Sequence, residues 1–104
     1  MRAGIALAAL LVVGACGGDS EGAARDRALQ HAREELRTQT YQQVHGSGDC
    51  ALDCSGHEAG YAWAKERQIE DASLCAARGP SFNRGCRAYT EDLAQRADAL
   101  LRAH

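Results

Sequence analysis

The sequence is poor in proline, in aromatic residues and in excess charge of either sign. Among 104 residues there are one proline, one tryptophan, one phenylalanine and three tyrosines, and the formal net charge is −2. The charged residues of both signs are mixed along the chain, so no basic patch predicts binding to nucleic acid. No stretch alternates polar residues with β-branched apolar ones, as a half-buried strand does. These absences favour a small all-α protein.

A run of apolar residues long enough to cross a membrane is also missing. Arg2 is followed by eleven largely apolar residues, 3–13 (AGIALAALLVV), whereas a membrane-spanning helix needs roughly 20. A basic residue before a short apolar region is typical of a secretion signal peptide. The run ends in Val-Gly-Ala-Cys at 13–16, which resembles the lipobox of bacterial lipoproteins. This resemblance implies that residues 1–15 are removed and that Cys16 becomes the lipidated N-terminus; the alternative is an ordinary signal peptide with a coincidental cysteine.

The resemblance to lipoproteins also implies a location. The next residues, 17–22 (GGDSEG), are similar to the flexible tethers of such proteins. Two or three acyl chains such as palmitate on Cys16 would anchor the chain durably in a lipid bilayer. In enteric bacteria an Asp directly after the lipidated cysteine retains a lipoprotein at the inner membrane. Here that position is Gly17, so we expect the outer membrane, facing the periplasm.

Without residues 1–15 the mature chain has 89 residues, with 11 basic and 14 acidic side chains. A chain of this length can bury only a modest core and forms one small domain. We expect a lipidated tether at 16–22, a helical stalk and linker at 23–49, and a disulfide-stapled helical domain at 50–104.

Four cysteines remain in the mature chain, and an even number in a short exported protein predicts disulfides. There is no C-x-x-C motif, and ten residues between the third and fourth cysteines do not suit a structural zinc site. Three pairings are possible. Of these the nested arrangement is favoured, because a bond between the first two would close a very small ring. The favoured pairs are Cys50 with Cys86 and Cys54 with Cys75.

Helical periodicity appears in three segments. Residues 23–37 carry a narrow apolar stripe, which predicts either a free stalk or a helix docked by one edge. The stripe consists of Ala28, Leu29, Ala32 and Leu36. Residues 38–44 show no clear period, and 45–49 (HGSGD) is a turn-rich break. From Gly79-Pro80, with Ser81 as the expected cap, a strong stripe runs to the C-terminus: Phe82, Cys86, Tyr89, Leu93, Ala97 and Leu100.

The third helix is expected over about 56–69. Ser55 and Glu58 fit the S-x-x-E capping box that begins many helices. The expected buried face consists of Ala59, Ala62, Trp63 and Ile69, while Gly60 and Ala64 leave a smooth patch for close approach of another helix. The sequence therefore predicts a small disulfide-stapled helical hairpin with an additional N-terminal helix or stalk.

Part of this region resembles other proteins. The stretch 54–64 (CSGHEAGYAWA), with Cys75 and 81–89 (SFNRGCRAY), is similar to a short segment in small exported bacterial proteins of unknown function. The resemblance covers residues 50–90 and implies a domain without indicating any chemistry.

Chemical candidates are few. A zincin motif after His57 and Glu58 would need a histidine at position 61, where Tyr61 stands. Asp53 with these three residues could perform acid–base chemistry, and His45 with Asp53 and His57 could bind a metal. We instead expect His57 and Glu58 to be structural, and Tyr61 and Trp63 to belong to the core.

The sequence therefore predicts no catalytic residue, no cofactor and no metal site. The favoured function is a non-enzymatic binding or structural module of the cell envelope, acting on an unidentified envelope protein or wall component. The alternatives are a small inhibitor or exclusion factor that acts on a periplasmic partner, and an enzyme that acts on the cell wall.

Overall fold

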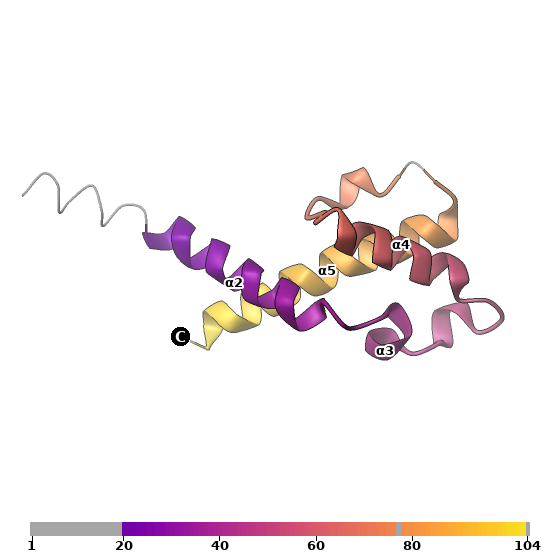
Figure 1. Cartoon of the computed structure of the whole chain (residues 1–104), viewed down its shortest axis with the longest axis horizontal. Helices are drawn as coiled ribbons and strands as arrows, with labels where there is room; N and C mark the ends of the chain where they lie inside the picture. Colours follow the sequence, from indigo (N-terminus) through magenta and orange to yellow (C-terminus); the bar gives the residue numbers. More distant parts are fainter. Residues whose placement is uncertain (1–19, 77, 104) are drawn as a thin grey trace, which may run out of the picture.

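The computed structural model describes residues 20–76 and 78–103, and within them it contains helices and no strand. Four α-helices follow one another: α2 (Ser20–Leu36), α3 (Tyr41–His45), α4 (Ser55–Glu66) and α5 (Pro80–Arg102) (Figure 1). Two short 3-10 turns, η1 (Gly48–Cys50) and η2 (Ala72–Leu74), lie in the connections. The predicted all-α class with disulfide bonds is confirmed. The predicted signal peptide and Cys16 lie outside the described residues, and none of the described helices has the length and hydropathy to span a bilayer.

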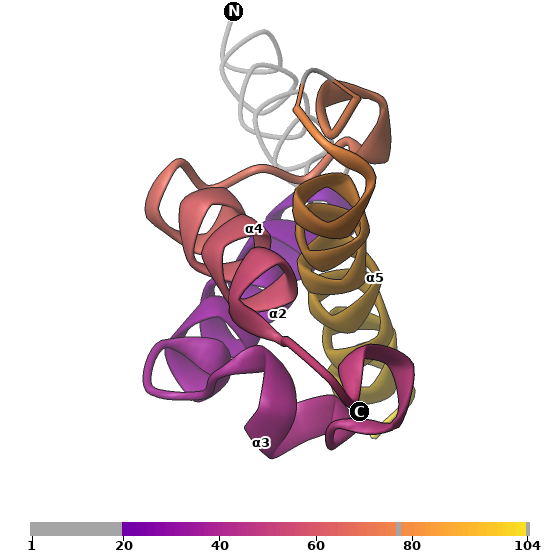
Figure 2. The ribbon, with the colours of Figure 1, turned by 90° about the vertical axis from the view of Figure 1, so that its right-hand side faces the viewer.

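Helix α5 is the centre of the fold. Helix α4 packs beside its first half and α2 beside its second half, and α3 closes the end of the structure near the start of α4 (Figures 1 and 2). Helices α2 and α5 run in opposite directions, since Arg25 near the start of α2 pairs with Asp98 near the end of α5 at 2.5 Å. Helix α5 therefore contributes side chains to every part of the core.

Helices α4 and α5 run in the same direction, which differs from the hairpin expected from the sequence. Gly56 faces Ser81, and one turn further along α4, Gly60 faces Phe82 and Cys86. The described parts of the connection, residues 67–76 and 78–79, lie across the top of the structure before α5 begins (Figure 1). The antiparallel neighbour of α5 is α2, because the long return connection makes α4 parallel to α5.

The stripe predicted for α5 forms its packing face. Pro80 occupies the first turn, where its missing N–H costs no hydrogen bond, and Gly79 rather than Ser81 is the N-cap. Four of the stripe residues are buried and the two outermost are half-buried; the buried ones are Cys86, Tyr89, Leu93 and Ala97. The α2 stripe is also confirmed, because Ala28, Ala32 and Leu36 are buried against the common core. Helix α2 is thus docked by this edge, the second of the two expected arrangements.

The buried face of α4 is not the expected one. The structure buries His57, Gly60, Tyr61 and Ala64, whereas Ala59 and Ala62 are exposed and Trp63 and Ile69 are half-buried. The prediction placed Ala59 and Ala62 inward, but α5 packs against the face that carries Gly60, and this face also buries His57 and Tyr61. The smooth patch formed by Gly60 and Ala64 is confirmed as the contact with α5.

Two glycines make this contact possible from opposite sides. A Cβ atom on Gly60 would lie 2.8 Å from the carbonyl carbon of Phe82, and a Cβ on Gly85 would lie 2.7 Å from the carbonyl carbon of His57. Backbone atoms of one helix therefore occupy the space where the other helix would carry a side chain. No larger residue fits at either position without separating the helices.

The nested disulfide pairing expected from the sequence is wrong. The structure joins Cys50 to Cys54, with Cα atoms 4.8 Å apart, and Cys75 to Cys86, with Cα atoms 5.6 Å apart. The small ring is possible because η1 and the turn before α4 bring residues four apart to ordinary disulfide distance. The second bond attaches the return connection to the buried face of α5, where Cys86 is fully buried.

Candidate functional site

Glu58 is structural, but it does not cap its own helix. The N-cap of α4 is Cys54, without a side-chain hydrogen bond, so the capping box expected between Ser55 and Glu58 does not form. Instead the two carboxylate oxygens of Glu58 accept hydrogen bonds from the backbone N–H groups of Tyr41 and Gln42, at 2.8 and 3.1 Å. These are first-turn donors of α3 that its helix leaves unsatisfied. Glu58 therefore joins α3 to α4.

Helix α3 was not anticipated, although its sequence contains a signal for it. Thr40 is the N-cap, its hydroxyl accepts from the N–H of Gln43, and the Gln43 side chain accepts from the N–H of Thr40. This is a capping box of the T-x-x-Q form. Gly46 then ends the helix with a φ of 73°, which glycine adopts without strain.

Asp92 lies at the junction of three helices and is the principal site residue that the sequence interpretation missed. Its side chain is buried, and the hydroxyl of Tyr61 donates to Oδ2 at 2.7 Å. His45 Nε2 lies 2.8 Å from the same oxygen. A buried carboxylate is tolerated only when it has such partners. The available signal was its spacing, because Asp92 follows Tyr89 by three residues and so falls on the buried face of α5.

Aromatic rings surround this junction. Tyr41 stacks on His45 with centroids 4.9 Å apart, and Tyr61 meets the edge of Tyr89 at 5.3 Å. Burial, reinforced by the hydrogen bond to Asp92, raises the pKa of Tyr61 well above its usual range. Burial also raises the pKa of Tyr89. These phenols are therefore neutral packing groups in the folded protein, and the prediction that Tyr61 belongs to the core is confirmed.

His57 is enclosed on α4 at only 5% exposure. Its ring meets the edge of Tyr41 with centroids 5.0 Å apart, and its Nδ1 lies 3.3 Å from the hydroxyl of Ser81. Its Nε2 has no hydrogen-bond partner among the described residues. A serine and a histidine thus lie near each other, but no described carboxylate bonds to the far nitrogen, as the orienting group of a Ser-His-Asp arrangement does.

The other candidates do not converge. Asp53 is exposed and accepts from the N–H of Ser55 at 3.0 Å, and this backbone hydrogen bond lowers the pKa of Asp53. Across residues 20–76 and 78–103, no three His, Cys, Asp or Glu side chains are grouped as metal ligands. Trp63 is half-buried against Phe82, with centroids 5.6 Å apart, and Arg67 lies over its ring.

A shallow polar pocket of about 290 Å³ lies between α3 and α5. Tyr41, His45 and Asp49 line one side, and Arg84 and Glu91 are among the residues of the other side. Because acidic and basic groups both line this pocket, its charge selects neither an anion nor a cation.

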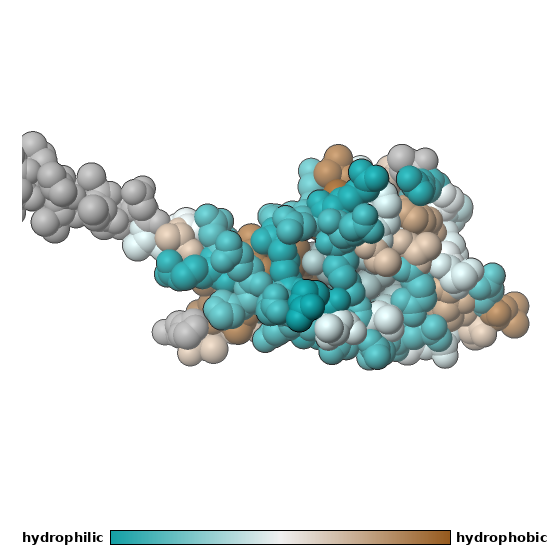
Figure 3. All heavy atoms as spheres, in the orientation of Figure 1, coloured by the Kyte–Doolittle hydropathy of each residue, from teal (hydrophilic) through white to brown (hydrophobic). Residues whose placement is uncertain are grey.

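The most exposed large hydrophobic side chain among the described residues lies in the ring closed by Cys50 and Cys54. Leu52, in the middle of this ring, has a relative exposure of 103%, so it contacts nothing in the domain. In Figure 3 the visible face is mostly hydrophilic, and apolar atoms protrude at the right-hand end, where Figure 1 places the connection between α3 and α4. The sequence signal was a large aliphatic residue in an otherwise small and polar stretch, 46–56 (GSGDCALDCSG).

Comparison of the chain with protein-family models, with curated proteins and with solved structures finds no match in any of the three. The resemblances to lipoproteins and to small exported proteins therefore remain predictions from the motifs themselves.

Proposed function

We propose that this protein is a lipid-anchored lipoprotein of the bacterial cell envelope, in the outer membrane and facing the periplasm. Its helical domain is a non-enzymatic module that binds another envelope protein. The motif at 13–16 supports the anchor, and the disulfides support the compartment. Cys50, Cys54, Cys75 and Cys86 are all paired, and disulfides persist in oxidising compartments such as the periplasm.

The observation that carries the binding role is the presentation of Leu52. A leucine that is fully exposed in a flexible loop is common and has no special meaning. Here the loop is a ring of five residues closed by a disulfide, so the exposed side chain is held in a restricted set of positions. A side chain ordered in advance loses less conformational entropy on binding. An apolar tip fits an apolar pocket on a protein better than it fits the polar polymer of the cell wall.

The polar residues that could perform catalysis also support a binding role, because their side chains are held in contacts between helices. The carboxylate of Glu58 bonds to the backbone of α3, and that of Asp92 bonds to Tyr61 and lies beside His45. These groups hold helices together. Neither carboxylate lines the polar pocket between α3 and α5, whereas an enzyme of the cell wall would present its ionisable groups in an open cleft.

The binding role is tested by photo-crosslinking in intact cells. A benzoylphenylalanine at position 52 should give discrete adducts with one envelope protein, and the same probe at Leu74, which is 56% exposed on η2, is the matched control. Leu52→Asp should weaken binding to the crosslinked protein. Adducts that are no more discrete from position 52 than from position 74 would refute the proposed contact.

The anchor is tested separately by metabolic labelling with an alkyne fatty acid. The wild-type protein should be labelled and Cys16→Ser should not. An unlabelled mature protein in the soluble periplasm would refute lipidation and leave the crosslinking result unaffected.

A further inference from the structure

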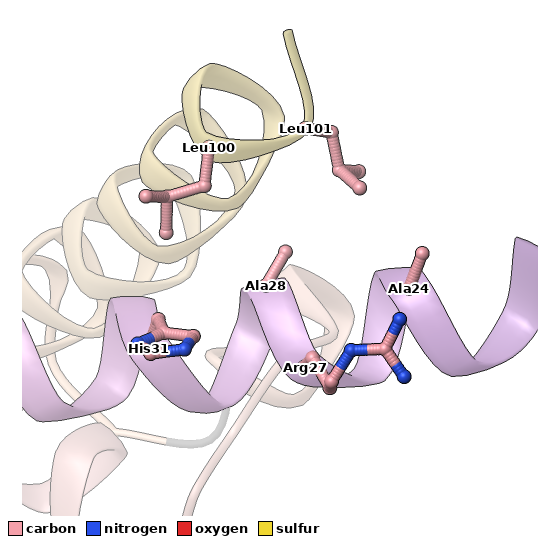
Figure 4. Close-up of a pocket in the computed structure, with 6 residues that line it drawn as sticks. All are labelled: Ala24, Arg27, Ala28, His31, Leu100 and Leu101. Carbon is pink, nitrogen blue, oxygen red and sulfur yellow. The ribbon is translucent and has the colours of Figure 1, made fainter. Parts of the chain in front are cut away.

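An apolar groove lies at the opposite end of the domain from Leu52. It runs between the first half of α2 and the last turns of α5 and has a volume of about 490 Å³. The residues that line it are Ala24, Arg27, Ala28, His31, Leu100 and Leu101 (Figure 4). Four of them are apolar, and the other two are the cation Arg27 and the imidazole of His31.

The groove exists because small side chains face large ones. Leu100 and Leu101 project from α5 toward the face of α2 that carries Ala24 and Ala28 (Figure 4). Two methyl groups cannot fill the space that two leucines leave, so both leucines are only half-buried. The pair of Arg25 with Asp98 at 2.5 Å holds the two helices together nearby. The domain therefore keeps an apolar groove open to solvent at this end.

The chain length places this groove close to the predicted anchor. Only residues 17–19 separate Cys16 from Ser20, the first residue of α2. Fully extended, these four peptide steps span at most about 14 Å. Ala24 follows Ser20 by about one helical turn, which adds roughly 6 Å. A domain anchored through Cys16 thus has this groove within about 20 Å of the lipid attachment.

We propose that this groove docks on the surface of the lipid bilayer, an inference that rests on the proposed lipidation of Cys16. Leu100 and Leu101 enter the boundary between headgroups and acyl chains, and Arg27 meets lipid phosphates. No acidic residue lines the groove among the described residues, which matches an anionic phosphate layer above an apolar interior. Interfacial helices combine the same two features, with basic residues beside large apolar ones.

Docking would also orient the domain. The groove lies at the end of the structure where α2 begins and α5 finishes, while the Cys50–Cys54 ring lies at the other end (Figure 1). A bilayer bound at the first end leaves Leu52 pointing into the periplasm. An attachment through Cys16 alone would not fix this orientation, so the groove adds a second contact that does.

The test uses the mature lipidated protein, residues 16–104, in vesicles of phosphatidylethanolamine and phosphatidylglycerol whose acyl chains carry bromine near the headgroup. Trp63 is the only tryptophan, so Trp63→Phe gives a silent background. Leu101→Trp in this background is the probe and Leu52→Trp is the matched control. Interfacial side chains lie roughly 5–10 Å into the boundary, so the probe should lose at least about half of its emission. The control should lose little.

The other outcomes distinguish a failure of the bilayer contact from a failure of the orientation or of the anchor. If the protein sediments with vesicles but the probe is not quenched, the groove does not touch the bilayer and the inference fails while the anchor stands. Equal quenching of probe and control refutes the orientation. A concentration-dependent blue shift of the probe without vesicles would show a second copy in the groove and overturn the inference. If the protein and Cys16→Ser both fail to sediment, the proposed anchor itself is wrong. Amide hydrogen exchange in the last turn of α5 should be slower with vesicles than without. This measurement uses the unsubstituted protein, so it does not depend on either introduced tryptophan.

Discussion

The close approach of α4 and α5 can be tested by adding a single methyl group at the contact, with the substitution Gly60→Ala. In an exposed helix this change stabilises by about 1 kcal/mol, because alanine has the higher helix propensity. At position 60 the new Cβ would lie 2.8 Å from the carbonyl carbon of Phe82 and 2.9 Å from the backbone nitrogen of Cys86. Carbon atoms pack best at about 3.5–4.0 Å, and the carbonyl oxygen of Phe82 would lie nearer still, so the helices must separate by roughly 1 Å.

The cost of that separation can be estimated. A gap of this size removes about a quarter to a half of the dispersion energy of each contact across the interface. The interface contains the largest fully buried side chains of α4 and α5, including Tyr61, Tyr89 and Leu93. Because backbone atoms obstruct the methyl group, we expect the upper part of the overpacking range, about 3 kcal/mol. The gain in propensity leaves a net loss of about 2 kcal/mol, which lowers the Tm of a domain of this size by about 8–16 °C.

The assay is thermal unfolding followed by far-UV circular dichroism. Gly22→Ala is the control, since Gly22 lies in α2 with nothing within 4 Å of an added Cβ, and it should raise the Tm. Gly85→Ala should destabilise like Gly60→Ala, because its Cβ meets the backbone of His57. The double variant should lose less than the sum, because one separation relieves both collisions. A Gly60→Ala protein that melts at or above the wild-type temperature would refute this packing.

Three further predictions follow from the polar and covalent contacts. Glu58→Gln should lower the free energy of unfolding, measured in urea, by about 1–2 kcal/mol, because the amide has one acceptor oxygen for two N–H donors of α3. A variant that keeps normal stability but loses a biological activity would indicate catalysis instead. Above about pH 10 stability should fall by about 1.4 kcal/mol per pH unit through Tyr61, and further through Tyr89, because burial raises the pKa of both phenols in the folded state and the unfolded phenols ionise first. Phenolate absorbance that rises before unfolding would contradict this. Replacing Cys75 and Cys86 together by alanine should cost about 3 kcal/mol for a closed loop of about 12 residues, and peptide mapping of unreduced protein should recover that bond.

The structural features that the sequence predicted correctly are those that depend on neighbours within one or two helical turns. The stripes of α2 and α5 repeat every three to four residues, and a helix turns once in 3.6 residues, so periodicity alone identifies the buried face. The small patch of Gly60 and Ala64 is also local, because residues four apart share one side of a helix. The all-α class follows from these patterns and from the absence of strand alternation.

Tertiary structure decided the features that join distant residues. The buried face of α4 depended on Gly60, because the backbone of α5 occupies the space where a side chain at this position would lie. Which helix Glu58 caps depended on α3, 16 to 17 residues earlier in the chain. The bond of Cys75 to Cys86 depended on the return connection to α5, whereas the turn at η1 brought Cys50 to Cys54. Spacing along the chain leaves such choices open, since several pairings satisfy the same local rules and only the packing of the whole core selects one.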